Sequence, residues 1–444
     1  MTAQSTTNGP TGSADSAESA EAAQAAREAG DPDFDVAIVG AGPVGLALAA
    51  WLARRSASAG LAVALVDARE PEDATNDPRA IAVSEGSRML LEPLGAWPAD
   101  AHPIERIHVS ERGRFGRTLI ERDEHGLAAL GYVVRYGSLV QTLARTVRRT
   151  AVDWFTSTSA LPPRNEPGDD ALTLPLETGA VRRTVRARIV VNAEGGLFGE
   201  VRTGEGESER ETEGETHSPH GAAGSTEVAR RTMRDYRQTA LVGVVSAATP
   251  QPDTAWERFT GEGPIALLPM GGVGQADYAL VWCMSPDEAT RRAGLADAEL
   301  LDELGRAFGS RMGRFEAIRG RAAFPLGLAA AKTLVDGRIA AIGNAAQTLH
   351  PVAGQGLNLG LRDAHALADA LARLGPVPDA LAAFAKARRL DRTLTIGATD
   401  TLARLFTADL GPLSPLRGLA LTALEFLPPA KTALARQMMF GQRQ

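Results

Sequence analysis

The chain has 444 residues, a hydrophobic content of 44% and a formal net charge of −7 at pH 7. This length predicts two or three domains, and the acidic balance excludes the basic face that nucleic-acid binding requires. The single cysteine, Cys283, excludes an internal disulfide framework and is typical of a reducing cytoplasm. We therefore expect a globular cytoplasmic protein.

The N-terminal part of the chain predicts a disordered tail followed by a βαβ unit. Residues 1–33 are rich in Ala, Ser, Thr, Glu and Gln and lack the basic start and apolar core of a secretory signal. Residues 34–67 then predict a strand, a glycine turn, a helix over Leu46–Arg55 and a strand over Leu61–Asp67. Because three glycines and Pro43 interrupt its long uncharged run, this pattern favours strand, turn and helix over a membrane span.

The next segments alternate between helical and extended patterns. Ser84 is suited to cap a helix, and residues 132–148 carry apolar side chains at helical spacing. Short Thr- and Val-rich runs over 152–193 indicate antiparallel strands with a long hairpin loop. Glu, Gly, Ser, Thr and Arg dominate residues 199–232, so we expect a flexible acidic insertion there.

Residues 233–319 predict the sheet of a second, substrate-facing domain. Its expected strands are the apolar runs 239–245, 263–270 and 278–283, and a helix is expected over 299–308. The last seventy residues have a largely helical pattern. Within them, the apolar run Pro415–Leu427 is suited to packing on the protein's own core, or alternatively to contacting a membrane or a partner protein.

The first motif that carries chemistry is Gly40-Ala41-Gly42-Pro43-Val44-Gly45, between the first strand and the first helix. In such a fingerprint the first glycine allows a tight turn, the second lets a pyrophosphate approach the backbone, and the third lets helix and strand pack closely. Asp67 ends the next strand and is placed to accept hydrogen bonds from a ribose hydroxyl pair. The context predicts dinucleotide binding, without separating FAD from NAD.

The second motif favours FAD. A strand expected over 338–342 turns at Gly343-Asn344, where the Asn344 amide can face ribityl hydroxyls. The turn Gly354-Gln355-Gly356 then opens a helix expected over 361–374, so that backbone N–H groups and a positive dipole end can face the pyrimidine edge of a flavin. The alternative is a simple strand–loop–helix connection.

At this point the sequence resembles the class A FAD-dependent aromatic hydroxylases, and within them the ubiquinone-biosynthesis branch, which is 2-polyprenyl-6-methoxyphenol hydroxylase-like. The resemblance spans about residues 34–440. The segments that carry it are 77–84, 256–259, 263–269, 281–282 and above all 343–363. The branch uses Gly-Asn-Ala-Ala-Gln at the late turn, as this chain does, where most aromatic hydroxylases have an aspartate after the glycine.

The resemblance assigns site residues one by one. Gly40, Gly42, Pro43, Gly45 and Asp67 would hold the ADP half of FAD. The remaining cofactor-binding positions would be Arg79, Gln141, Glu194, Gly343, Asn344, Gly356, Leu357 and Asn358. Pro351 and the backbone of Gly354, Gln355 and Gly356 would line the reactive face of the ring. No metal site is expected.

Two positions need separate treatment. The family's middle motif usually reads Ala-Asp-Gly, whereas this chain has Ala193-Glu194-Gly195, so the contact expected there must shift. His350 has a side chain whose ordinary pKa suits a general base. A histidine in a tight loop is more often structural, and hydroxylation does not demand it.

The expected fold is therefore mixed α/β, with a Rossmann-like FAD-binding domain interleaved with a smaller β-sheet substrate domain and a helical C-terminus. The expected parts are a tail at 1–33, the FAD-binding domain at 34–198 and 320–400, the insertion at 199–232, the substrate domain at 233–319 and C-terminal helices at 401–444. Part of 80–130 is expected to contribute to the substrate side.

The resemblance implies a monooxygenase that uses FAD, NAD(P)H and O₂ to hydroxylate a polyprenylated phenol through a flavin hydroperoxide. Such a substrate dissolves in membranes, so a site open to the inner membrane or to a biosynthetic assembly is implied. The alternatives are hydroxylation of another aromatic compound, an FAD oxidase or reductase that does not hydroxylate, and a non-catalytic FAD-binding scaffold. The scaffold predicts that substitutions at Pro351 and Gly356 leave function intact.

Overall fold

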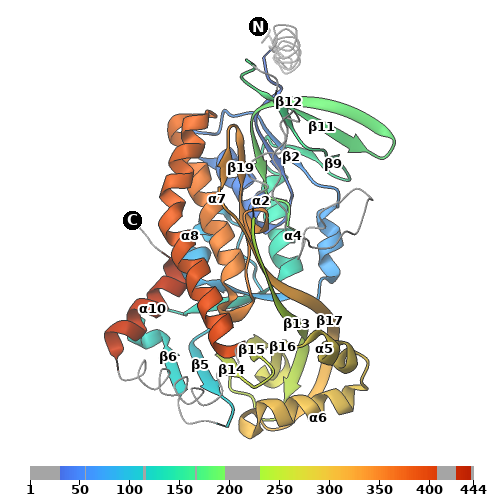
Figure 1. Ribbon diagram of the computed structural model, residues 1–444, viewed down its shortest axis with the longest axis vertical. Coiled ribbons are helices and arrows are strands. Elements are labelled where there is room, and N and C mark those ends of the chain that lie inside the picture. The colour runs from blue at the N-terminus through green and yellow to red at the C-terminus, as the bar shows by residue number, and fades with distance from the viewer. Residues whose placement is uncertain are drawn as a thin grey trace, which may run out of the picture.

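The computed structural model describes residues 31–55, 57–113, 117–165, 168–195, 231–407 and 427–441. The predicted βαβ unit is confirmed (Figure 1). It consists of β1 (Phe34–Val39), α2 (Pro43–Arg54) and β2 (Val63–Val66), with the two strands paired in parallel. The helix begins earlier than expected because Gly42 stands at its N-cap and proline is suited to the first turn of a helix.

The βαβ unit forms the centre of a nine-stranded sheet. Its main path runs β10-β11-β12-β1-β2-β8, and β9, β18 and β19 pair outside this path. The added strands are β8 (Asp153–Phe155), β9 (Ser159–Ala160), β10 (Arg164–Asn165), β11 (Leu172–Thr178), β12 (Val181–Asn192), β18 (Val335–Asp336) and β19 (Ile339–Ala341).

The strands of segment 152–193 pair differently from the purely antiparallel arrangement that the sequence predicts. β11 and β12 are antiparallel, as expected. However, β12 also runs parallel to β1 and to β19, and β8 runs parallel to β2. This segment therefore completes the parallel sheet around the glycine motif.

An eight-stranded sheet occupies the lower half of Figure 1, in the order β20-β17-β13-β16-β15-β14-β5-β6. Its strands are β5 (Arg106–Glu111), β6 (Arg117–Glu121), β13 (Arg231–Ala247), β14 (Thr254–Phe259), β15 (Pro264–Gly271), β16 (Asp277–Met284), β17 (Phe315–Ala331) and β20 (Gln347–Thr348). The three predicted strands are confirmed within β13, β15 and β16. The unpredicted β17 continues across residue 320, where the sequence places a domain boundary.

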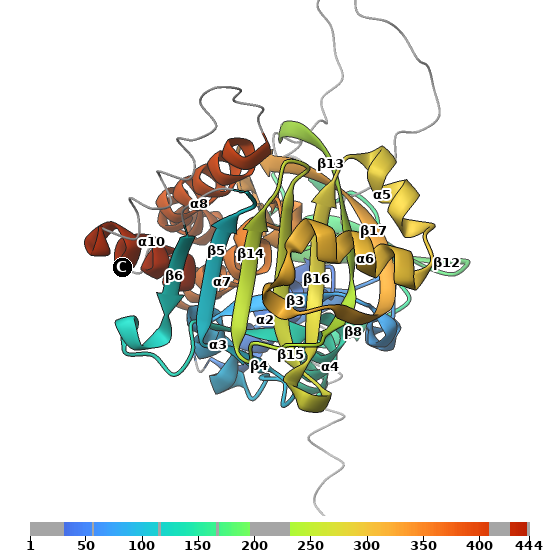
Figure 2. The same ribbon diagram turned by 90° about the horizontal axis from the view of Figure 1, so that it is seen from below.

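This sheet has two faces because side chains alternate along each strand. Leu241, Trp256 and Trp282 belong to a buried cluster with Leu304 and Phe308 of α6 (Asp297–Phe308), a helix that confirms the one expected over 299–308. Figure 2 shows α6 on the near side of the strands, with α2 and α7 (Gln355–Leu374) on the far side. We call the α6-covered side the outer face and the opposite side the inner face.

A small three-stranded sheet contacts both parts of the molecule, through β15 and through α7. Its strands are β3 (Ala80–Ser84), β4 (His102–Ile104) and β7 (Gly131–Arg135). The predicted cap is confirmed, because Ser84 accepts a hydrogen bond from the Ser87 backbone N–H at the start of α3 (Glu85–Leu91). The helix expected over 132–148 is α4 (Tyr136–Val147), preceded by β7.

The remaining helices are α5 (Pro286–Ala293), α8 (Pro378–Thr407) and α10 (Pro428–Phe440), and α8 packs beside α7. Short 3₁₀ helices are η1 (Pro71–Asn76), η2 (Glu92–Leu94), η3 (Arg122–His125), η5 (Val273–Gln275), η6 (Ser310–Met312), η7 (Gly343–Ala345) and η8 (Val352–Gly354). Among the described helices, none has the length and apolar character needed to cross a bilayer. The expected tail, the acidic insertion and the run Pro415–Leu427 lie almost wholly outside the described residues.

Candidate functional site

The three glycines of the first motif occupy positions with different steric demands. Gly40 has a φ of +107°, and a Cβ there would lie 2.7 Å from backbone atoms of Ala193 and Glu194. A Cβ on Gly45 would lie 1.9 Å from the Gly40 carbonyl oxygen. By contrast, the nearest atom to a Cβ on Gly42 is the Tyr136 hydroxyl oxygen, at 3.8 Å. Gly40 and Gly45 are therefore required by the fold, whereas Gly42 leaves room in front of the helix start.

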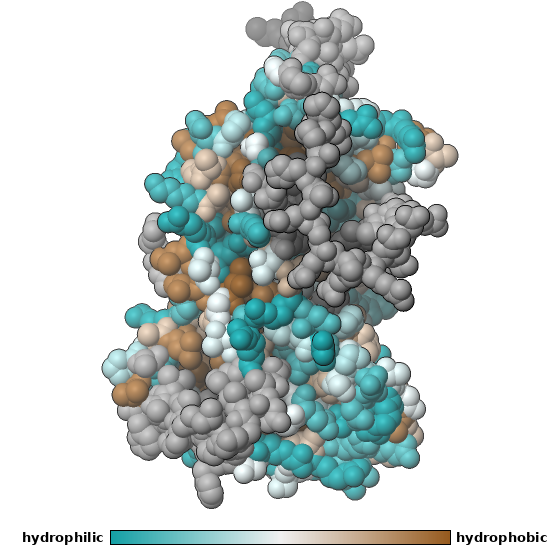
Figure 3. All heavy atoms as spheres, viewed as in Figure 1, coloured by the Kyte–Doolittle hydropathy of each residue, from teal (hydrophilic) through white to brown (hydrophobic). Residues whose placement is uncertain are grey.

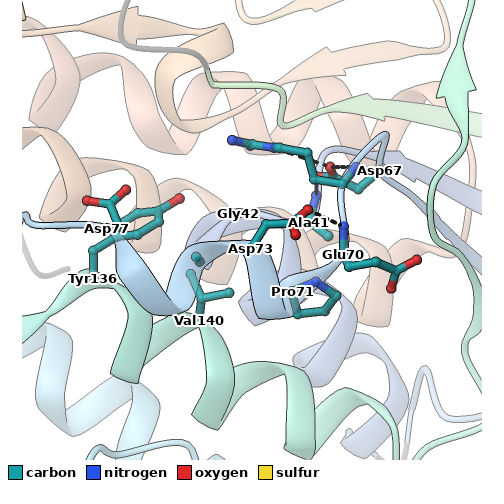
Figure 4. Close-up of a pocket in the computed structure, with 11 residues that line it drawn as sticks. Ala41, Gly42, Asp67, Glu70, Pro71, Asp73, Asp77, Tyr136 and Val140 are labelled. Carbon is teal, nitrogen blue, oxygen red and sulfur yellow. Dashed lines mark hydrogen bonds and ion pairs between the residues drawn. The ribbon is translucent and has the colours of Figure 1, made fainter.

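A pocket opens at this helix start, between α2, η1 and α4 (Figure 4). Its lining residues are Ala41, Gly42, Asp67, Arg69, Glu70, Pro71, Asp73, Ala74, Asp77, Tyr136 and Val140. The Asp67 carboxylate accepts hydrogen bonds from the backbone N–H groups of Ala41 at 2.6 Å and Arg69 at 2.8 Å. These bonds fix the carboxylate at the edge of the pocket, and its remaining lone pairs leave it able to accept from a hydroxyl.

The second glycine motif packs directly against the first. Gly343 has a φ of +59°, and a Cβ there would lie 3.2 Å from the Val44 side chain. A Cβ on Gly360 of α7 would lie 2.9 Å from Val44 and 3.0 Å from the Gly343 Cα. The starts of α2 and α7 are thus brought together through positions where only glycine fits. Nothing in the sequence spacing of the two motifs indicates this contact.

The turn before α7 has a left-handed residue followed by open space. Gly354 stands at the N-cap of α7 with a φ of +59°. A Cβ on Gly356 would meet no atom within 4 Å. The first backbone N–H groups of a helix have no acceptor within the helix itself. Gly42 and Gly356 therefore each leave space beside a helix start, as a bound anion or a polar ring edge requires.

The Asn358 side chain is fully engaged by the protein. Its Oδ1 accepts from the Ser84 backbone N–H at 2.9 Å, and its Nδ2 donates to the carbonyl oxygens of Ala82 at 3.0 Å and Gly354 at 2.8 Å. The side chain of Gln355 donates from Nε2 to the Met438 carbonyl oxygen of α10 at 3.3 Å. Leu357 packs against the large core cluster. A polar contact of Asn358 or Leu357 with a cofactor would therefore be made by the backbone.

His350 lies in the loop before this turn, next to Pro351, and is only 1% exposed. Its Nδ1 accepts from the Val352 N–H at 3.2 Å, so the ring proton lies on Nε2, which donates to Gln238 Oε1 at 3.0 Å. Burial lowers the pKa of His350 to about 4. In this arrangement both ring nitrogens bind protein atoms, which favours the structural reading of His350 over the general base.

The middle motif, Ala193-Glu194-Gly195, also lies against the late turn at Gly343-Asn344. A Cβ on Gly195 would lie 2.9 Å from the Asn344 Cβ, so the middle motif abuts the late turn. Desolvation and the nearby Asp67 carboxylate raise the pKa of Glu194. No hydrogen bond of the Asn344 amide is seen within the described part of the chain, and its side chain is partly accessible.

Arg79 and Gln141 do not line the pocket, but each contacts residues that line it. Arg79 donates from Nε to Asp77 Oδ1 at 2.8 Å and lies 4.2 Å from the centre of the Tyr136 ring. Although burial opposes ionisation of Asp77, hydrogen bonds from Arg79 lower its pKa. Gln141 donates from Nε2 to the Pro71 carbonyl oxygen at 2.7 Å, which ties α4 to η1. Both residues position groups that line the pocket.

Sequence reasoning missed the buried polar cluster that supports α7. Gln347 donates to Asp363 Oδ2 at 2.8 Å and accepts from Arg392 Nε at 2.7 Å. Asp363 also binds Arg388 Nε at 2.7 Å. The sequence does carry a signal for this cluster, because charged residues occupy positions on an otherwise apolar face of α7 and α8.

The residues present fit FAD. Three glycine-rich turns converge, two of them leave space at helix starts, and an acidic residue stands at the end of β2, where an adenine-side ribose hydroxyl would require an acceptor. FAD is long enough to need contacts at more than one turn. The convergence of turns from the beginning, middle and end of the chain meets this need.

Comparison with known proteins agrees with this geometry. The chain belongs to the FAD binding domain family, which matches residues 33–391. It is 33% identical over 418 residues to a ubiquinone hydroxylase of Rhodospirillum rubrum, covering 91% of this chain and 89% of that protein. It is 30% identical over 406 residues to 3-demethoxyubiquinol 3-hydroxylase of Escherichia coli, covering 88% and 94%.

The fold is also similar to that of a solved structure with much lower sequence identity. The crystal structure of p-nitrophenol 4-monooxygenase from Pseudomonas putida superposes with a TM-score of 0.67 at 16% identity, covering 93% of this chain and 99% of that one. This superposition shows the fold, and the family match together with the two relatives identifies the chain as an FAD-dependent aromatic-ring monooxygenase, as the resemblance implies. Its mixed α/β fold and its FAD cofactor are likewise those expected from the sequence.

Proposed function

We propose that this protein hydroxylates a polyprenylated phenol in ubiquinone biosynthesis, with NAD(P)H as the electron donor and O₂ as the co-substrate. The relatives named above support this proposal, since each is named for hydroxylation of a ubiquinone or a ubiquinol precursor. The observation that carries it is the meeting of the late glycine turn with the inner face of the eight-stranded sheet. Gln238 on β13 and His350 beside that turn are joined by a hydrogen bond of 3.0 Å.

In this proposal the chain's own residues have separate tasks. Gly40 and Gly45 let the turn and α2 pack closely, Gly42 admits the pyrophosphate to the start of α2, and Asp67 accepts from the ribose. The backbone N–H groups of the first turn of α7 stabilise negative charge on the reduced ring. When bound, the flavin supplies the reducing equivalents and the activated oxygen. The protein orients the phenol and excludes water from the ring face.

This proposal keeps the division into an FAD-binding part and a substrate-binding part that the sequence predicts. The nine-stranded sheet with α2 and α7 forms the FAD side, and the eight-stranded sheet with α6 forms the substrate side. Strands β5 and β6, from segment 80–130, lie in the second sheet. The substrate would enter between the two parts.

We also propose that the protein contacts a membrane surface, from which a prenylated phenol can be taken. Leu390 and Leu394 of α8 are 57% and 42% exposed, one helical turn apart. Apolar side chains gather on the face of the molecule that carries α8 (Figure 3). An apolar strip on an exposed helix is suited to insert into the interfacial region of a bilayer.

The test of function is mass spectrometry of quinone lipids in cells that lack this chain, before and after it is restored. The proposal expects a polyprenyl phenol to accumulate and then to disappear on restoration. Normal quinone content in the deletion would contradict the ubiquinone assignment. NAD(P)H consumption by the purified protein without an oxygenated product would instead favour an oxidase or a reductase.

A further inference from the structure

Glu257 is an acidic residue on the inner face of the eight-stranded sheet. Its neighbours along β14, Trp256 and Arg258, point to the outer face, where Trp256 packs on Phe308 of α6 and Arg258 lies over the same ring. Because side chains alternate along a strand, Glu257 points the other way, together with Ala255. Ala255 packs in a cluster with Ala82 of β3 and Leu268 of β15, so this side of β14 lies against the small three-stranded sheet.

The row of the sheet that contains Glu257 is otherwise apolar towards α7. Across the row, Glu257 pairs with Val109 on β5 and with Ala266 on β15. Ala266 pairs with Val281 of β16, and Val281 pairs with Val242 of β13. These side chains are small or branched and carry no polar atom. The Glu257 carboxyl group is therefore flanked on the inner face by short apolar side chains.

The Glu257 carboxyl has no protein partner. Within the part of the chain that the structure describes, it makes no hydrogen bond and no ion pair, and the residue keeps some accessible surface. Burial raises the pKa of Glu257 to about 8. Burial and the nearby Glu257 also raise the pKa of the Cys283 thiol on β16. The buried acids Asp363 and Asp391, by contrast, are ion-paired with arginines.

Two contacts link this face to the loop and turn that precede α7. On β13, Gln238 bonds to His350 at 3.0 Å. In the small sheet, Ala82 packs against the cluster that contains Ala255, and it would lie 3.1 Å from a Cβ on Gly354. The inner face thus borders the backbone that we propose to face the flavin ring.

We propose that Glu257 is the polar anchor for the aromatic substrate, hydrogen-bonding the phenolic oxygen and so fixing which ring carbon faces the flavin. This inference rests on the proposed function, because it requires a phenol in the space between the inner face and the α7 turn. A neutral carboxyl group both donates and accepts, which matches a phenol hydroxyl group in both directions. The surrounding small apolar side chains accommodate the ring itself.

The protonated form is the one that suits this task. An ionised carboxylate without a partner in an apolar site is strongly disfavoured, whereas the neutral acid requires only one hydrogen-bonding partner. The phenol provides that partner, so binding satisfies a group that the protein leaves unsatisfied. A ring lacking the hydroxyl group would leave the carboxyl group without a partner and be rejected.

The experiment compares the wild-type holoenzyme with Glu257→Gln and Glu257→Leu. The probes are a 2-methoxyphenol that carries one prenyl unit and the matching methoxybenzene without the hydroxyl group. Binding is followed by the change in flavin absorbance, and hydroxylation by product analysis. Glu316→Gln is the matched control, because Glu316 is an exposed acid on β17 of the same sheet. Flavin content and melting temperature verify that each variant is folded.

We expect Glu257→Leu to weaken binding of the phenol about tenfold, and to leave binding of the methoxybenzene unchanged or tighter. Glu257→Gln keeps a donor and an acceptor, so its phenol affinity should stay within about threefold of the wild type. Infrared spectra at neutral pH should show a protonated carboxyl carbonyl band in the wild type and in Glu316→Gln, which is lost in Glu257→Gln.

Equal effects of Glu257→Leu on both probes, or no effect on either, would overturn this inference while the proposed function stands. Loss of hydroxylation in Glu257→Gln with unchanged phenol affinity would likewise overturn it, because the residue would then act as a base. A wild-type enzyme that neither binds nor hydroxylates any phenol would overturn the proposed function, and this inference with it.

Discussion

His350 lies beside the turn at Gly354 as a buried neutral imidazole, held by Gln238 and by the Val352 backbone. Its pKa of about 4 in the folded protein is below the ordinary value of 6.5. The unfolded chain therefore binds more protons between these values, and stability falls as the pH falls from 6.5 to 4. We expect this side chain to cost on the order of 2 kcal/mol at pH 5 relative to pH 7.

The measurement is urea unfolding of the wild type and His350→Gln at pH 7 and at pH 5. The variant should be less stable than the wild type at pH 7, because it lacks the ring that packs on Tyr236. Its loss between pH 7 and pH 5 should be smaller. Equal losses in both proteins would show that His350 is not neutral in the fold.

Gly42 and Gly45 allow the cofactor site to be tested apart from the fold. Gly42→Ala adds a methyl group whose nearest neighbour, the Tyr136 hydroxyl oxygen, is 3.8 Å away, so we expect flavin-free protein to lose at most about 1 kcal/mol while FAD content falls sharply. Gly45→Ala drives a methyl group into the Gly40 carbonyl oxygen, so it should destabilise the flavin-free protein itself. The measurements are bound flavin per chain and the melting temperature without flavin. Full FAD content in Gly42→Ala would contradict the proposed position of the pyrophosphate.

At the scale of elements, α7 and α8 are joined by buried ion pairs. Asp363 binds Arg388 at 2.7 Å, and Asp391 binds both Arg388 and Arg362. Burial disfavours the charge of Arg388, but the two carboxylates outweigh it and raise the pKa of its guanidinium. The cluster therefore holds the middle of α7 against α8.

Asp363→Asn should destabilise the protein by about 3 kcal/mol, because it removes one of the two carboxylates that pair with the buried Arg388 guanidinium. Asp369→Asn on the same helix is the control, since Asp369 is 46% exposed and its ion pairs should contribute less than about 1 kcal/mol. Chemical unfolding of the two variants measures the difference. Equal destabilisation would mean that the buried cluster does not hold α7 in place.

The elements that the sequence predicts best are those whose cause is local. The βαβ unit and the Ser84 cap follow from short-range periodicity and one side chain. β17 was not predicted, because its exposed and buried residues do not alternate regularly and its partner β13 lies far away in the chain. The same limit applies to the site. Glycine spacing predicts a cofactor turn, but neither the packing of Val44 on Gly343 nor the use of the Asn358 side chain on β3 has a local signature.

At the scale of the whole molecule, we propose that the sheet that carries Glu257 and the helix that carries Leu390 and Leu394 serve one route for a lipid-soluble phenol. The exposed leucines would rest at the membrane surface, and the apolar inner face would receive the ring. The two features separate experimentally, because membrane contact acts on access to the substrate and Glu257 acts on its orientation.

We therefore expect Leu390→Gln combined with Leu394→Gln to reduce co-sedimentation with liposomes of mixed zwitterionic and anionic lipids. Each removed leucine side chain contributes about 1.5–3 kcal/mol on full burial, so a loss of at least tenfold in partitioning is expected. Turnover of a short-tailed phenol in solution should remain at the wild-type level, whereas turnover of a long-tailed phenol supplied in liposomes should fall. Unchanged partitioning would place the membrane contact elsewhere on the molecule, and equal losses for both substrates would show that the substitutions damage the site instead.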